Sequence, residues 1–256
     1  VVEEIGPAPP VQPLAPFDRD ESSVTLGVAG FGVVRVDASR VRVIGPDEAA
    51  RAGLWARLGT WASAQWYLTQ GFDVLRGTCV ASGDRCIALL GASQQGASAT
   101  AAWLTTMGWG LISDGIVVLD DRGVALSRAP LIELDTQLAD ILFANAPRRV
   151  SPAGRPRTAI TVPDHGDMEL TDLVFIRVMP VAEGVTVVPP EKLTPGRGRG
   201  VRVHLMAGSA VGVSELPDVP VWAVLRNQPT NPEILAKVHP PAVARAVADA
   251  LAGATP

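Results

Sequence analysis

The fold of this chain is decided by one stretch, CIALLGASQQGAS, at residues 86–98. Its first five residues are all apolar, which is typical of a strand buried on both faces. A glycine loop follows at residues 91–96, and residues 97–107 are predicted to form a helix that Gly108 closes. Strand, glycine loop and helix in this order are the context that a phosphate-binding P-loop requires, because the loop amides and the helix N-terminus together attract anions.

The loop fits the P-loop pattern G-x-x-x-x-G-K-[ST] at all but one of its fixed positions. Gly91 and Gly96 hold the glycine positions and Ser98 holds the hydroxyl position. Ala97 stands where the lysine belongs. Losing such a donor typically lowers a transfer rate by about 10²–10³-fold. On spacing alone, an ordinary strand-to-helix turn with two glycines remains an equal alternative.

A second candidate group lies downstream of the loop. Asp114 follows the apolar residues Leu111 and Ile112, and in P-loop enzymes an acidic residue at a strand end holds Mg²⁺. If the protein is active, Asp114 is the candidate catalytic residue, and Ser98 and Asp114 are the candidate Mg²⁺ ligands. The candidate nucleotide- or phosphate-binding residues are those of the loop and first helical turn: Gly91, Ser93, Gln94, Gln95, Gly96, Ala97, Ser98 and Ala99. The two glutamines either plug the nucleotide space, bind a ligand or are solvated.

The remaining sequence predicts one α/β domain behind a proline-rich lead. Residues 1–22 hold five prolines without apolar periodicity, so a flexible or extended segment is expected there. Residues 23–256 are expected to form a single domain, a mixed β-sheet flanked by helices. Apolar patterns predict strands within 24–44 and at 74–81, 86–90, 111–114, 116–120, 173–178 and 185–188, and helices at 46–71, 97–107, 131–143 and 240–252. Residues 147–166 show no clear element.

Composition excludes several classes of function. The net charge is −4, so the chain lacks the basic field that nucleic acids select. No run of 18 apolar residues is present, so no membrane span is expected, and without a secretory pattern a cytoplasmic location is expected. Cys79 and Cys86 form no CxxC pair and are expected to be reduced core residues. The three histidines are scattered and predict neither a metal site nor a catalytic triad.

Three segments around the loop resemble one known family. They are LRGTCVA at 75–81, LLGASQQGASA at 89–99 and GWGLISDGIVVL at 108–119. They are similar to L-H-A-S-A-V-A, G-x-S-G-x-G-K-S-T and L-x-x-D-D-V-V-V-L in the catalytic domain of HPr kinase/phosphorylase and the HPr kinase-like proteins of bacterial gene clusters. Looser matches at 129–134, 173–180 and 219–222 extend the resemblance over residues 24–252. The resemblance implies an HPr kinase/PEP carboxykinase-like P-loop fold.

The departures from that family all lie at positions where the family has residues that take part in catalysis or phosphate binding. Where the family has its histidine, its P-loop lysine, the threonine after the P-loop serine and its second aspartate, this chain has Arg76, Ala97, Ala99 and Gly115. Ser98 and Asp114 remain. The resemblance therefore implies a degenerate Walker A motif and a pseudokinase that binds a protein or peptide partner, in a setting such as a biosynthetic gene cluster. Because HPr kinases are oligomers, it also makes a homo-oligomer an expectation.

Two other functions stay open at this point. The first is an active ATP-dependent phosphotransferase, acting on a serine or peptide with ATP and Mg²⁺ as cofactors. In that case a relocated cation replaces the lysine, the candidates being Arg76, Arg148, Arg149, Arg155 and Arg157. The second is a pocket that holds a different small anionic ligand. No cofactor is expected with certainty under the pseudokinase hypothesis.

Overall fold

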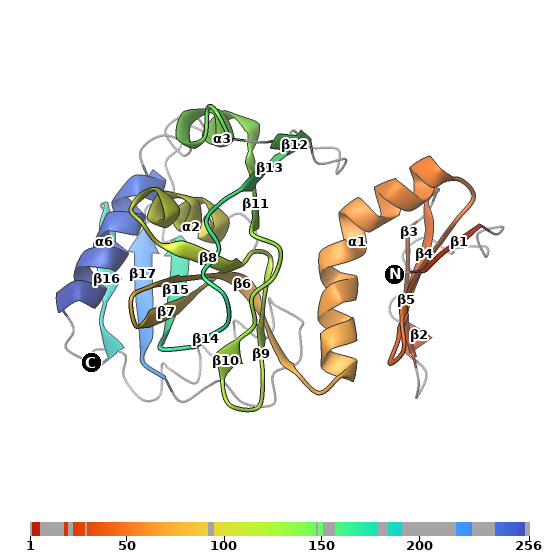
Figure 1. Cartoon of the computed structure of the whole chain (residues 1–256), viewed down its shortest axis with the longest axis horizontal. Coiled ribbons are helices and arrows are strands. Elements are labelled where there is room, and N and C mark those ends of the chain that lie inside the picture. Colours follow the sequence, from red (N-terminus) through yellow and green to blue (C-terminus); the bar gives the residue numbers. More distant parts are fainter. Residues whose placement is uncertain are drawn as a thin grey trace.

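The structure is a computed structural model of the chain. It describes residues 2–5, 18–19, 23–28, 30–91, 95–146, 148–150, 157–178, 184–190, 219–226 and 239–253. A mixed sheet forms its centre (Figure 1), with the strand order β14-β10-β9-β6-β7-β15-β17-β16 and with β8 also paired to β6. These strands are β6 (Asp73–Ser82), β7 (Arg85–Leu90), β8 (Gly110–Ser113), β9 (Ile116–Leu119), β10 (Val124–Ala125), β14 (Met168–Glu169), β15 (Asp172–Val178), β16 (Val185–Val188) and β17 (Val221–Arg226).

The central strands run parallel and the flanking strands antiparallel. β15 pairs in parallel with both β7 and β17, whereas β6 and β16 pair antiparallel with β7 and β17. One face of this sheet packs against α2 (Ala97–Thr106) and α6 (His239–Gly253), which also contact each other. The predicted fold class, a mixed α/β sheet flanked by helices, is confirmed by this arrangement.

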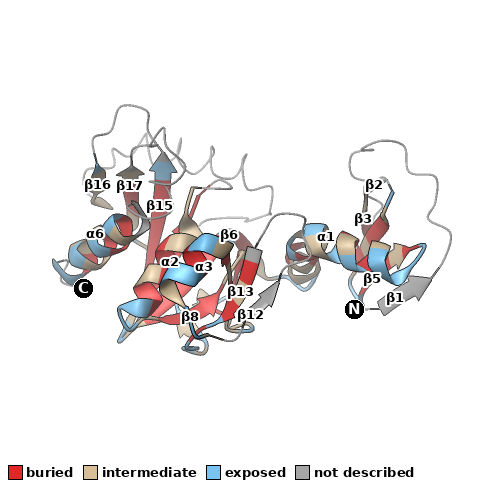
Figure 2. Cartoon of the chain, turned by 90° about the horizontal axis from the view of Figure 1, so that it is seen from above, coloured by how far each residue is buried: buried red, intermediate tan, exposed pale blue. Residues whose placement is uncertain are grey.

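A second, smaller sheet lies at the N-terminal end. Its order is β1-β5-β4-β3-β2, comprising β1 (Val2–Ile5), β2 (Asp18–Arg19), β3 (Ser23–Val28), β4 (Gly32–Asp37) and β5 (Val41–Gly45). Two of these strands lie inside residues 1–22, where a flexible or extended segment was expected. Helix α1 (Glu48–Thr69) lies between this sheet and the central one (Figures 1 and 2). The division of the chain into domains stays a prediction.

Both ends of α1 follow from local sequence. The Asp47 side chain caps the helix by accepting a hydrogen bond from the Ala50 N–H at 2.7 Å. Gly71, at a φ of +86°, then turns the chain after Gln70, where an L side chain would be strained. The helix predicted over residues 46–71 is therefore confirmed.

The helix predicted over residues 131–143 is wrong in its first half. Residues Leu131–Asp135 form the strand β11, and only Thr136–Leu142 form a helix, α3. β11 pairs with β13 (Arg157–Thr161), which pairs with β12 (Arg148–Val150), inside the region where no element was predicted. The reason is that buried Ile132 and Leu134 alternate with less buried neighbours, a period of two that a strand needs. Asp135 then caps α3 by accepting from the Gln137 N–H.

The two cysteines lie in the core, as predicted. Both are buried and not disulfide-bonded, and their sulfur atoms lie 3.5 Å apart across the β6–β7 hairpin. The hydrogen bond with Cys86, together with burial, raises the pKa of the Cys79 thiol well above its usual range. Within the described residues, no group of three His, Cys, Asp or Glu side chains is placed to hold a metal ion. None of the described helices is long and apolar enough to cross a membrane.

Candidate functional site

The predicted strand, loop and helix are all present around the glycine loop. β7 ends at Leu90, and α2 begins at Ala97 after Gly96, whose φ of +97° is the left-handed conformation that favours glycine. Gln95 folds back toward Gly91: a Cβ built at Gly91 would lie 3.1 Å from Gln95 Oε1 and 3.0 Å from the Ile176 carbonyl oxygen. A side chain at position 91 would therefore be crowded by these two oxygen atoms. Ser93 and Gln94 lie outside the described residues.

The two predicted Mg²⁺ ligands lie side by side. Ser98, in the first turn of α2, donates its hydroxyl to Asp114 Oδ1 at 2.8 Å. Asp114 follows β8 in the tight corner between β8 and β9, as the sequence predicted. Because β8, which ends just before Asp114, pairs with β6 of the hairpin that leads into the loop, residues 16 apart in sequence meet at one point.

Asp114 has two further partners that were not predicted as site residues. The Thr78 hydroxyl donates to Asp114 Oδ1 at 2.6 Å, and the backbone N–H of Glu133 donates to Asp114 Oδ2 at 3.0 Å. Thr78 lies on β6, is 1% exposed, and its hydroxyl is 3.5 Å from that of Ser98. A hydroxyl residue next to the apolar run Cys79-Val80-Ala81 was the signal available for Thr78. No sequence signal pointed to Glu133, because it contributes a backbone group.

The other positions of the pattern have distinct surroundings. Ala97 and Ala99 are partly buried and pack against the main core under α2. Gly115 has a φ of +83°, and a Cβ there would lie 3.3 Å from Thr60 Cγ2 of α1. The Gly115 carbonyl accepts a hydrogen bond from the Gly77 N–H at 3.3 Å. The backbone at position 115 is therefore left-handed and close to a neighbouring helix.

The candidate replacement cations are spread over the molecule. Arg76 is exposed on β6, two residues before Thr78. Arg148 and Arg149 lie on β12 and Arg157 on β13, two strands of the sheet that begins at β11. Arg155 lies outside the described residues. Arg76 is thus the candidate that shares a strand with a residue of the Asp114 cluster.

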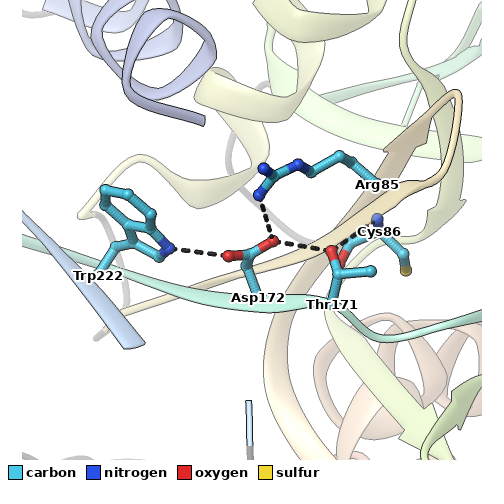
Figure 3. Close-up of polar contacts among 5 residues, drawn as sticks. All are labelled: Arg85, Cys86, Thr171, Asp172 and Trp222. Carbon is cyan, nitrogen blue, oxygen red and sulfur yellow. Dashed lines mark hydrogen bonds and ion pairs between the residues drawn. The ribbon is translucent and has the colours of Figure 1, made fainter. Parts of the chain in front are cut away.

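A second polar cluster lies at the opposite end of the parallel strands (Figure 3). Asp172, 1% exposed at the start of β15, accepts from the Trp222 indole N–H at 2.8 Å and forms an ion pair with Arg85 at 3.3 Å. The Thr171 hydroxyl lies 2.8 Å from Asp172 Oδ2 and accepts from the Cys86 N–H at 3.1 Å. This cluster ties β7, β15 and β17 together where they begin, whereas the glycine loop follows the end of β7.

Fold and site together define a mixed α/β protein with a strand–glycine loop–helix unit and a hydroxyl–carboxylate cluster beside it. Comparison with protein families finds no matching family model, and comparison with curated proteins finds no match. Among solved structures, the chain is similar to the Hpr(Ser) kinase/phosphatase from Coxiella burnetii, with 8% identity and a TM-score of 0.36. The similarity covers 70% of this chain and 91% of that one. A likeness this distant does not show membership of that family, and no site residue is transferred from it.

Proposed function

We propose that this protein is a catalytically degenerate, HPr kinase-like P-loop protein that acts by binding a protein or peptide partner. The observation that carries the proposal is the state of Asp114. Its carboxylate accepts three hydrogen bonds from its own chain, from Thr78, Ser98 and the Glu133 N–H. These use three of about four lone-pair positions on a carboxylate, so little capacity remains for Mg²⁺ or a substrate hydroxyl.

The loss of positive charge supports the same proposal. Ala97 packs against the core where a P-loop lysine would grip the phosphates. Gly115, in the position of a second aspartate, brings no carboxylate to the corner. A site without the lysine and the second acid lacks both the cation that binds the phosphates and the group that acts on a substrate hydroxyl. The fold around it is preserved, which favours a scaffold retained for binding.

One observation favours an active phosphotransferase as the second candidate. The hydroxyl of Ser98 and the carboxylate of Asp114, 2.8 Å apart, are oxygen donors of the kind that Mg²⁺ prefers. If ATP and Mg²⁺ bind, these two residues would hold the metal ion, which would neutralise charge on the phosphates. Thr78 and the Glu133 N–H would then fix the orientation of the Asp114 carboxylate.

The test is a transfer assay paired with a binding assay. The full chain is incubated with radiolabelled ATP, Mg²⁺ and the protein and peptide products of genes adjacent to its own, and the same products are tested for binding by fluorescence anisotropy. We expect binding of one such product without incorporation of label, by both the wild type and Asp114→Asn. Incorporation that disappears in Asp114→Asn would overturn the proposal in favour of the phosphotransferase. Absence of binding to every product would overturn the partner-binding function.

A further inference from the structure

Between the part of β6 that packs under α1 and the part that packs under α2, one side chain, that of Arg76, is exposed. On β6, Val74, Arg76, Thr78 and Val80 share one face because side chains alternate along a strand. Val74 packs in the cluster under α1, and Val80 packs in the main core under α2. The two residues between them on this face are Arg76, which is exposed, and Thr78, which is buried and contacts Ser98 of α2.

Arg76 is the charged residue on this face of β6, between Val74 and Thr78. Its neighbour across the sheet is Ile116, two residues after Asp114, and its neighbour along the same face is Thr78, which bonds Asp114 at 2.6 Å. Arg76 is exposed, and within the described part of the chain its side chain makes no hydrogen bond or ion pair. The Asp114 carboxylate is instead satisfied by hydroxyls and a backbone amide, which leaves the guanidinium available to a ligand.

We propose that Arg76 is the residue that recognises a phosphate group on the ligand of this site. The inference rests on the proposed function, because it takes the Asp114 corner to be a binding site. A guanidinium is planar and presents paired N–H donors that match two phosphate oxygens at once. Its charge also offsets that of Asp114, which by itself would repel an anion. The phosphate belongs either to a nucleotide or to a phosphorylated residue of the partner.

Arg76 lies on a different element from the position at which a P-loop has its lysine. A lysine at position 97 would extend from the first turn of α2, whereas Arg76 extends from β6, two residues before Thr78.

Isothermal titration calorimetry on the full chain, at fixed ionic strength, tests the inference. The probes are inorganic phosphate, ADP and phosphoserine, with serine and succinate as phosphate-free controls. We expect at least one phosphate compound to bind the wild type, and Arg76→Ala to weaken that binding about 10- to 100-fold. Arg76→Lys should recover part of the affinity, because it restores the charge without the paired donors. Arg245→Ala, a change at an exposed arginine on α6, is the matched control and should bind like the wild type.

Three outcomes would overturn the inference. They are equal affinity in Arg76→Ala and the wild type, no binding of any phosphate probe by the wild type, and equal binding of succinate. Tighter binding of ADP assigns the phosphate to a nucleotide, and tighter binding of phosphoserine assigns it to a phosphorylated partner. If calorimetry contradicts the role of Arg76, the proposal that the protein binds a partner still stands. If phosphate transfer depends on Asp114, the proposed function is wrong, but Arg76 remains a phosphate-binding residue. Because Arg76 is exposed, Arg76→Ala should keep the wild-type unfolding midpoint, which confirms that the fold is intact.

Discussion

Thr78 and Asp114 form the shortest hydrogen bond of the candidate site, at 2.6 Å between Oγ1 and Oδ1. Thr78 is almost fully buried, so its hydroxyl has little access to water if the partner is lost. Asp114 lies between a helix residue, a strand residue and a backbone amide of β11. These three contacts fix the carboxylate and connect three elements, which gives Asp114 a structural role independent of catalysis.

The first prediction concerns Thr78. Thr78→Val keeps the shape of the side chain but removes the donor, so Asp114 keeps two of its three partners. We expect the free energy of unfolding to fall by about 1–3 kcal/mol, because the remaining carboxylate is less well satisfied. Urea unfolding measures the change. Thr186→Val on β16, at an exposed position, is the control and should change stability by less than about 0.5 kcal/mol. An unchanged Thr78→Val would show that the hydrogen bond adds no net stability.

Sequence reasoning reached part of this site for a clear reason. Gly91, Gly96 and Ser98 belong to one local motif, so spacing alone was enough to find them. Asp114 was found from a buried strand that ends in an acidic residue. Thr78 and the Glu133 amide were missed because they come from elements that only tertiary pairing brings to the corner.

At the scale of elements, the parallel strands are joined at their start by Asp172. A single buried carboxylate there connects Arg85 of β7 and Trp222 of β17 through β15 (Figure 3). The glycine loop leaves β7 at its other end. These side-chain contacts add to the backbone pairing of the same strands, at the end remote from the loop.

The second prediction tests this connection. Asp172→Ala removes the acceptor of the Trp222 indole N–H and the carboxylate that pairs with Arg85, so we expect a loss of about 3–5 kcal/mol in the free energy of unfolding. Arg85 is 20% exposed, and water therefore reduces the part of this loss that comes from the ion pair. Urea unfolding followed by circular dichroism gives the value. Arg122→Ala breaks an exposed pair with Asp120 and should cost less than about 1 kcal/mol. Equal effects of the two changes would contradict the prediction.

Elements with local signals were predicted well, and elements made by distant pairing were not. The β6–β7 hairpin, α1 and α2 carry their own turns, caps and apolar periods. β12 and β13 are short and surrounded by prolines and glycines in the sequence, so their pairing with β11 gives no local pattern. The apolar residues of 131–143 fit a helical period over too short a window to exclude a strand.

At the scale of the whole molecule, α1 belongs to two hydrophobic cores. Leu54 and Ala62 pack against Val34 and other valines of the N-terminal sheet. Ala64 packs against Val74 and Ile116 of the central sheet. A helix of 22 residues is about 33 Å long, enough to serve both sheets with different parts of its surface. The N-terminal sheet is therefore joined to the candidate site through one rigid element.

The third prediction follows from this shared helix. We expect the chain to unfold in a single transition, with coincident midpoints by tryptophan fluorescence and far-ultraviolet circular dichroism. Leu54→Ala, a change at a fully buried position, should shift both midpoints together and lower stability by about 2–5 kcal/mol. Ala52→Ser at an exposed position of α1 should cost about 0.5 kcal/mol or less. Two separate transitions would show that the N-terminal sheet and α1 fold independently of the central sheet.

The close approach of α1 to Gly115 limits which residues the corner beside Asp114 can accept. An aspartate at position 115 would have to adopt a backbone with a φ of +83° and find room beside Thr60. An acid at position 115 would therefore strain the backbone and crowd a helix that two cores hold in place, whereas a lysine at position 97 would replace a partly buried alanine in the first turn of α2. An acidic substitution at this corner would therefore lower the stability of the fold before it could add a reactive group.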